Sequence, residues 1–195
     1  MKIKYLLICL TLSVFSCSPT LKIKPLNVKT GKLPTDTRLA DSEIKVDKQI
    51  DLNKYRQFLF ITGTGTSSGR YGDYVSETLK EIGGFDKFYT ENQMEQFIIQ
   101  NNLTDKVTNI SDRIGLLNLQ KQVGNFLFCE TVVERVGRYE YTFEFKIIDP
   151  SGSEILLDIK HAAFDWSGLD RPLFNPVFNY YIDWLKSSQN KRENT

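Results

Sequence analysis

The sequence predicts an α+β fold, in which helices pack on a single mixed sheet that ends in a C-terminal β-meander. Two observations predict this class. Between residues 57 and 122, apolar runs of strand length are separated by segments with helical spacing. After residue 125, apolar and polar residues alternate as they do in half-buried strands. The expected order of elements is β-α-β-α-α-β-β-β-α.

The first half of the domain supplies two strands and three helices. The strands are expected at Gln57–Ile61 and Lys87–Tyr89, which are short and rich in apolar or aromatic residues. The helices are indicated by apolar residues at helical spacing and are expected at Val75–Ile82, Met94–Ile98 and Ser111–Gln122. A short extended stretch near Ile44–Val46 precedes them.

The second half predicts a meander and a closing helix. Phe126–Val133 is one strand, and Tyr139–Ile147 alternates strictly between apolar and polar side chains. Asp149–Gly152 has turn chemistry, so that Glu154–Ala163 pairs back as a hairpin. Asn175 is expected to cap the final helix, with Pro at its first position.

These second-half segments carry a resemblance to known proteins. Its residues are Gly124–Phe128, Phe143–Leu156 with its Asp-x-x-Gly turn, and the aromatic-rich closing helix at Phe174–Tyr181. The order resembles the domain shared by the curli-secretion lipoprotein, the N-terminal domain of TolB and the lipoprotein activators of penicillin-binding proteins. The resemblance covers about residues 55–187. It implies a domain that binds other proteins and is not catalytic, and it transfers no functional residue to this chain.

The beginning of the chain has the pattern of a secretion signal. Lys2 and Lys4 precede an apolar run, Tyr5–Phe15, which is too short to cross a bilayer. Val14-Phe15-Ser16-Cys17 resembles a bacterial lipobox, which implies cleavage before Cys17 and a lipid on its thiol. The alternatives are an ordinary signal peptide or an uncleaved anchor, each with a chance cysteine. Ser18 is not the Asp that retains enteric lipoproteins at the inner membrane, so the outer membrane is favoured.

Four regions are therefore expected: a signal peptide at 1–16, a lipidated Cys17 with a flexible tether at 17–52, an α+β domain at 53–188, and a polar tail at 189–195. The tether contains three prolines, many lysines and threonines, and no sustained hydrophobic period.

Charge and cysteine content narrow the classes of function. The chain has 25 Lys and Arg against 24 Asp and Glu, so composition gives no support for nucleic-acid binding. If Cys9 is removed and Cys17 is acylated, Cys129 is the one remaining thiol, and a disulfide framework is excluded. The sequence indicates no cofactor and no metal site, because its single histidine and single free cysteine supply too few ligands.

The glycine-rich loop at Gly63–Gly69 is the most suggestive internal motif. It follows a strand and precedes a helix, where an anion can meet backbone N–H groups; the residues concerned are Gly63, Gly65, Ser67, Ser68 and Gly69. The loop lacks the lysine of a P-loop and the spacing of a dinucleotide fingerprint. A plain connection is the leading interpretation, and a small anionic ligand or nucleotide is the alternative.

The remaining candidates favour structural roles. His161 is expected to be a buried or edge histidine, Cys129 a core residue, and Glu140 with Glu144 part of a solvated sheet face. Trp166 and Arg171 are candidates for contact with a partner, because both residue types are enriched at binding hot spots. The chain is therefore expected to be a non-catalytic, lipid-anchored component of envelope assembly, secretion or maintenance, with a protein partner and no nucleic acid.

Overall fold

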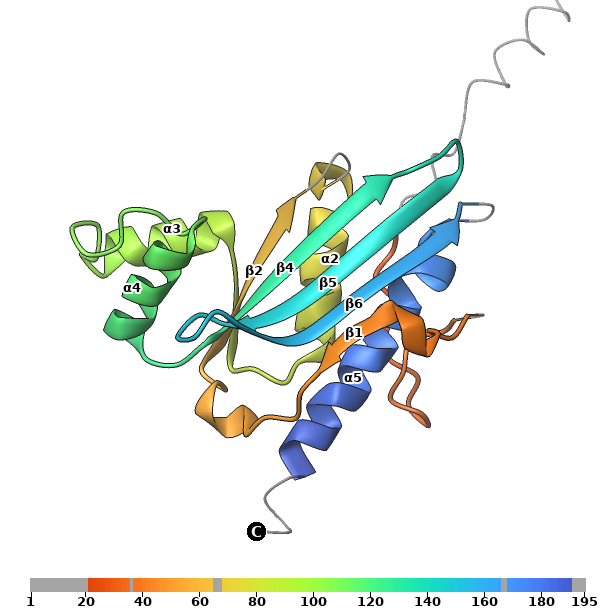
Figure 1. Cartoon of the computed structure of the whole chain (residues 1–195), viewed down its shortest axis with the longest axis horizontal. Coiled ribbons are helices and arrows are strands. Elements are labelled where there is room, and N and C mark those ends of the chain that lie inside the picture. Colours follow the sequence, from red (N-terminus) through yellow and green to blue (C-terminus); the bar gives the residue numbers. More distant parts are fainter. Residues whose placement is uncertain (1–20, 36, 65–67, 166–167, 191–195) are drawn as a thin grey trace, which may run out of the picture.

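The computed structural model describes residues 21–35, 37–64, 68–165 and 168–190 (Figure 1). Its centre is one six-stranded sheet with the spatial order β1-β6-β5-β4-β2-β3. The strands are β1 (Ile44–Asp47), β2 (Phe58–Thr64), β3 (Lys87–Thr90), β4 (Leu127–Arg135), β5 (Glu140–Asp149) and β6 (Glu154–Phe164). β2 runs parallel to β3 and β4, whereas the other pairs are antiparallel. The predicted mixed sheet with a C-terminal meander is confirmed.

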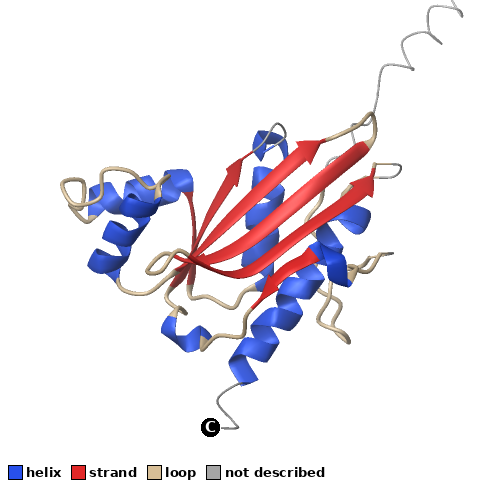
Figure 2. Ribbon diagram, in the orientation of Figure 1, coloured by secondary structure: helices blue, strands red, loops and turns tan. Residues whose placement is uncertain are grey.

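The helices lie on both sides of this sheet (Figure 2). They are α2 (Ser68–Ile82), α3 (Glu91–Gln100), α4 (Arg113–Val123) and α5 (Asn175–Asn190), with short turns η2 (Asp41–Glu43), η3 (Leu52–Lys54) and η4 (Asp170–Phe174). α2 and α5 cover one face, and α3 and α4 pack at the β2–β3 side (Figure 1). The predicted order of elements holds, with β1 added in front of it.

Strand β2 explains why there are two cores. Leu59 and Ile61 point into the main core beneath α2 and α5, whereas Phe58 and Phe60 point into a smaller core with α3 and α4. Neighbouring strand residues face opposite sides, so a fully apolar run fits a strand that is covered on both faces. This is the physical reason for the continuous apolar sequence at the start of the domain.

Strand β5 shows the other pattern. Tyr141, Phe143, Phe145 and Ile147 are buried in the main core, and the residues between them are only half-buried. Phe143 and Phe145 contact α5 through Phe178, with ring centroids 5.9 and 6.4 Å apart. Each such ring contributes about 1.5–3 kcal/mol by leaving water. Burial on one face alone accounts for the strict alternation in the sequence.

The segment expected to be a flexible tether packs on the domain over its described part. Ile44–Val46 was expected to be extended, and it forms β1 at the edge of the sheet beside β6. Leu33 and Leu52 are buried in the main core. Isolated leucines at irregular spacing have no period, so the pattern of apolar residues did not reveal this packing. Residues 17–20 lie outside the described residues.

Two asparagines of α5 hold this segment in place. Asn179 accepts a hydrogen bond from the Leu33 N–H (2.8 Å) and donates one to the Leu33 carbonyl (2.9 Å). Asn175 donates to the Pro34 carbonyl at 2.7 Å and is fully buried. The expectation that Asn175 caps the helix is wrong, because helical backbone already begins at Asp170 in η4. The side-chain amide of Asn175 instead supplies a hydrogen-bond donor to the N-terminal segment where this segment crosses α5.

Candidate functional site

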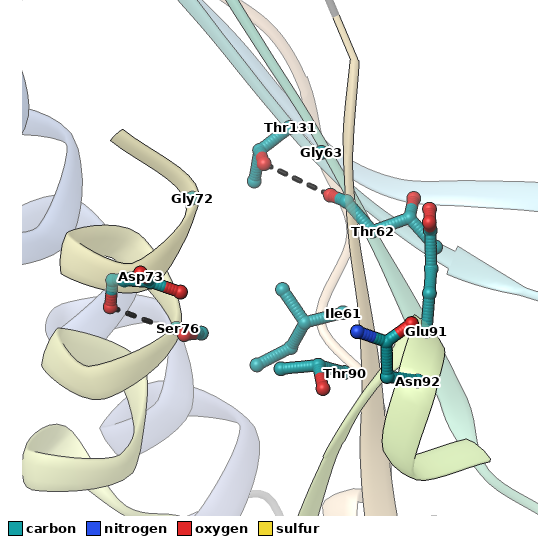
Figure 3. A pocket seen from close by; sticks show the side chains of 10 residues that line it. All are labelled: Ile61, Thr62, Gly63, Gly72, Asp73, Ser76, Thr90, Glu91, Asn92 and Thr131. Atoms are coloured by element: carbon teal, nitrogen blue, oxygen red, sulfur yellow. Dashed lines mark hydrogen bonds between the residues drawn. The ribbon is translucent and has the colours of Figure 1, made fainter. Parts of the chain in front are cut away.

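A pocket opens beside the carboxyl ends of the parallel strands β2 and β3, between α2 and α3 (Figure 3). Its volume is about 330 Å³. Its walls are formed by the strand residues Ile61, Thr62, Gly63, Thr90 and Thr131, the α2 residues Gly72, Asp73 and Ser76, and the α3 residues Glu91 and Asn92. Open sheets commonly bind ligands at this edge, so the pocket is the main candidate for a small-molecule site.

Hydrogen bonds within the protein already use the hydroxyl hydrogens of Thr131 and Ser76, two buried residues of this pocket. Thr131 donates from Oγ1 to the Thr62 carbonyl at 2.9 Å, and Ser76 donates from Oγ to the Asp73 carbonyl at 3.1 Å (Figure 3). A ligand therefore meets hydroxyl oxygens that still have acceptor capacity, since each hydroxyl has two lone pairs. The inner wall is suited to accept hydrogen bonds from a ligand.

The rim of the pocket is acidic. Asp73 and Glu91 are exposed at its mouth, and none of the described residues that line it is Lys, Arg or His. Two carboxylates at the mouth of the pocket repel a phosphate and attract a cation. The pocket chemistry therefore favours a neutral or cationic ligand over a nucleotide.

The glycine-rich loop meets this pocket at one residue. Gly63 lies in its wall, at the end of β2. Ser68 and Gly69 form the first turn of α2, and Gly65 and Ser67 lie outside the described residues. Sequence reasoning therefore pointed to the neighbourhood of the pocket but missed Asp73, Glu91 and Thr131. The feature that marks the pocket is that β2 lies between two parallel strands, β3 and β4. The spacing of residues within one loop does not reveal this arrangement.

His161 has two structural partners. Its Nδ1 lies 2.6 Å from Glu43 Oε1 of η2, and its Nε2 lies 2.8 Å from the Pro172 carbonyl of η4. Both ring nitrogens therefore lie within hydrogen-bond distance of an acceptor oxygen. Burial opposes ionisation of Glu43, but bonds from the Ala40 N–H and from His161 outweigh it, so the pKa of Glu43 lies below its ordinary value. The histidine joins β6 to two other segments, which agrees with the expected buried role.

The other predicted residues also have defined surroundings. Cys129 is fully buried, and burial followed by the charge of Glu130 raises the pKa of its thiol, so the core role is confirmed. Glu144 pairs with Lys146 at 2.8 Å on the half-buried sheet face. Arg171 is exposed in η4, where its carbonyl accepts a bond from Thr35 Oγ1 at 2.8 Å. Cys17 and Trp166 lie outside the described residues.

The described part of the chain contains no group of three or more His, Cys, Asp or Glu side chains that could hold a metal ion. It also contains no helix that is long and apolar enough to cross a membrane.

Comparison with known proteins finds likeness only among solved structures. No protein-family model matches this chain, and no curated protein matches it. Lipoprotein GNA1162 from Neisseria meningitidis is 14% identical over 70% of this chain and 98% of its own, with a TM-score of 0.39. The C-terminal domain of LpoB from Escherichia coli is 14% identical over 57% of this chain and 85% of its own, with a TM-score of 0.38. PelC from Paraburkholderia phytofirmans, solved as a dodecamer, is 12% identical over 75% of this chain and 95% of its own, with a TM-score of 0.43.

The resemblance that the sequence indicated, to lipoproteins, is found again among these structures. At such identities the likeness is one of fold. Function has to be argued from the residues of this chain.

Proposed function

We propose that this chain is a lipid-anchored, non-catalytic protein of the bacterial envelope, which binds a protein partner close to the membrane surface. The observation that carries the proposal is the order of Lys2 and Lys4, a short apolar run, and Ser16-Cys17. Acylation of Cys17 holds the domain at a membrane through its lipid chains. The outer membrane is the proposed location, because Ser18 follows the acylated cysteine.

The candidate catalytic groups support binding over catalysis, because each has a structural role. Both nitrogens of His161 are engaged by Glu43 and the Pro172 carbonyl. Cys129 is buried and its raised pKa keeps the thiol protonated, so it is a poor nucleophile. Glu144 is held by Lys146. A reaction would require at least one of these groups to leave its partner or its buried position.

Expression of the wild type and Cys17→Ser in a Gram-negative host tests the anchor. A fatty acid with an alkyne group labels the wild type when the thiol is acylated, and fractionation then places the protein in membranes. We expect the variant to lose the label and to be released or to keep its signal peptide. A labelled or normally processed and membrane-bound Cys17→Ser protein would refute the anchor.

The partner contact is proposed at Arg171, together with Trp166. Arg171 is exposed in η4. The N-terminal segment meets η4 next to it, where Lys24 binds Asp170 at 2.5 Å. A photo-crosslinking residue at position 171 should capture an envelope protein in living cells. The matched control is position 121, because Lys121 is also exposed and α4 packs in the smaller core on the other side of the sheet. Equal capture at both positions would contradict this contact.

A second candidate is a small ligand in the pocket beside Gly63. Its place at the carboxyl ends of β2 and β3 supports binding, and the carboxylates of Asp73 and Glu91 favour a neutral or cationic molecule. ATP, GTP, NAD, phosphate and a panel of amines can be compared by their effect on the melting temperature. A ligand at 100 times its Kd stabilises by about 2.7 kcal/mol, which such a measurement detects. A shift with nucleotides alone, abolished by Gly63→Val, would favour the anionic alternative instead.

A further inference from the structure

The chain between the proposed lipid anchor and the folded domain is short. Only residues 18–20 separate Cys17 from Leu21, the first residue that the structure describes. Fully extended, this connection spans about 14 Å. One headgroup layer of a bilayer is roughly 5–8 Å thick. The inference that follows rests on the proposed acylation of Cys17, which would hold Leu21 close to the membrane surface.

Leu21 belongs to one particular end of the domain. Its side chain packs against the main core, and Lys24 binds Asp170 at the start of η4. Five residues before Asp170, the N–H of Asp165 donates a hydrogen bond to the Tyr139 carbonyl at 2.7 Å. The N-terminal segment therefore begins near the sheet end formed by the β4–β5 hairpin and the end of β6 (Figure 1).

This sheet end exposes apolar side chains. Val136, Tyr139 and Phe164 are 55%, 44% and 52% exposed, and we call them the end patch. Tyr139 stands two residues before the buried Tyr141, so both belong to the same face of the sheet. Phe164 pairs with Glu140 and belongs to the other face. The end patch therefore borders both faces of the sheet. A flat surface that meets the strands end-on can contact all three side chains together, and a partner on one face cannot.

The polar residues around the end patch suit a membrane interface. The Arg138 guanidinium carbon lies 5.2 Å from the centroid of the Tyr139 ring, and Arg135 is also exposed. Glu134 and Glu140 offset these two charges, so aromatic and apolar contact outweighs net charge. Aromatic rings with arginines beside them are typical of the headgroup layer, where one part of each side chain is apolar and the other is wet.

We propose that the end patch rests in the headgroup layer of the same bilayer that holds the lipid on Cys17, so that the strands stand with this end toward the membrane. A second copy of the chain fits less well. Three half-exposed side chains offer a few hundred Å² at most, whereas a stable interface buries about 800 Å² on each partner. Because the connection from Cys17 is short, the lipid anchor already brings the membrane to this end of the domain, and no further partner is needed.

Quenching by lipids tests the orientation on the full-length acylated protein in vesicles. With Cys17 acylated and Cys129 buried, a single introduced cysteine can carry an environment-sensitive dye. The test positions are Tyr139→Cys and Phe164→Cys. The control is Ile114→Cys on α4, which is 71% exposed and lies away from this end. The vesicles carry spin labels on their acyl chains close to the headgroups, and flotation with the vesicles confirms the anchor in each sample.

We expect the spin-labelled lipids to reduce emission from positions 139 and 164, with no loss at 114. Flotation with equal quenching at all three positions, or with none at 139 and 164, would overturn the orientation and leave the anchor intact. Failure of the acylated protein to float would overturn the anchor and the orientation together. Shielded but unquenched dyes in a particle with the mass of a dimer would assign the end patch to a second copy, and would also overturn the proposal.

Discussion

Asn179 is the residue whose replacement best tests the packing of the N-terminal segment. Its side-chain amide forms both hydrogen bonds of the Leu33 backbone, at 2.8 and 2.9 Å, in a place where Leu33 is buried. Asn179→Ala removes both partners at once. Asn179→Asp keeps an acceptor for the Leu33 N–H but places a second oxygen against the Leu33 carbonyl, where a donor is needed.

The size of the effect follows from these two bonds. A buried backbone group that loses its partner costs about 1–3 kcal/mol, so Asn179→Ala should cost about 2–6 kcal/mol if the segment stays in place. If the segment detaches instead, its backbone groups bind water, and the loss of folding stability cannot exceed the stability that packing of the segment contributes. Burial of Leu33 alone contributes about 1.5–3 kcal/mol. We therefore expect both variants to lose about 2–4 kcal/mol.

Urea unfolding followed by the fluorescence of the buried Trp184 measures this loss, and trypsin cleavage at Lys29 and Lys32 measures release of the segment. Gln189→Ala on the exposed side of α5 is the matched control and should change stability by less than about 0.5 kcal/mol. If Asn179→Ala behaves like the control and cleavage is equally fast in all three proteins, residues 21–40 are a flexible tether and our account of their packing is refuted.

Two further predictions concern pH and close packing. Because the pKa of Glu43 is lowered in the folded state, its contribution is present above its ordinary value of 4.5 and is lost as pH falls through the folded value. Glu43→Gln should therefore flatten the acid limb of a stability-against-pH curve, and an unchanged limb would contradict the Glu43–His161 pair. Gly115→Ala should cost about 1–3 kcal/mol or more, because the new Cβ would lie 1.3 Å from the Asn109 carbonyl oxygen. Gly72→Ala has open space and serves as its control in thermal unfolding; equal melting temperatures would contradict the close contact.

The spacing of apolar residues and the residue types typical of turns were sufficient to predict most of the helices and strands. The alternation in Tyr139–Ile147 and the Asp149–Gly152 turn gave β5, β6 and their hairpin, because one buried face imposes a period of two. The apolar run before Gly63 gave β2, although covering helices on both faces were not evident from the run itself. Strand order was not predictable, because a parallel pair such as β2 and β4 is joined by a long crossover with no local signal.

Contacts between distant segments account for what the sequence did not show. The packing of residues 21–52 depends on single side chains, such as Leu33, that meet α5 about 146 residues later in the chain. The candidate pocket has the same origin, since Thr131 and Asp73 come together only when β4 and α2 pack beside β2. The glycine-rich loop marked the neighbourhood through Gly63, but the acidic rim that sets the ligand preference required the assembled sheet.

Mass spectrometry of the N-terminal peptide tests the central claim most directly. The protein would be extracted from membranes of a Gram-negative host and digested, and its first peptide would be sequenced with its modifications. We predict a peptide that begins at Cys17 and carries acyl chains on the thiol. A first peptide that begins at Met1 or at any other residue, or one in which Cys17 carries a free thiol, would contradict the account.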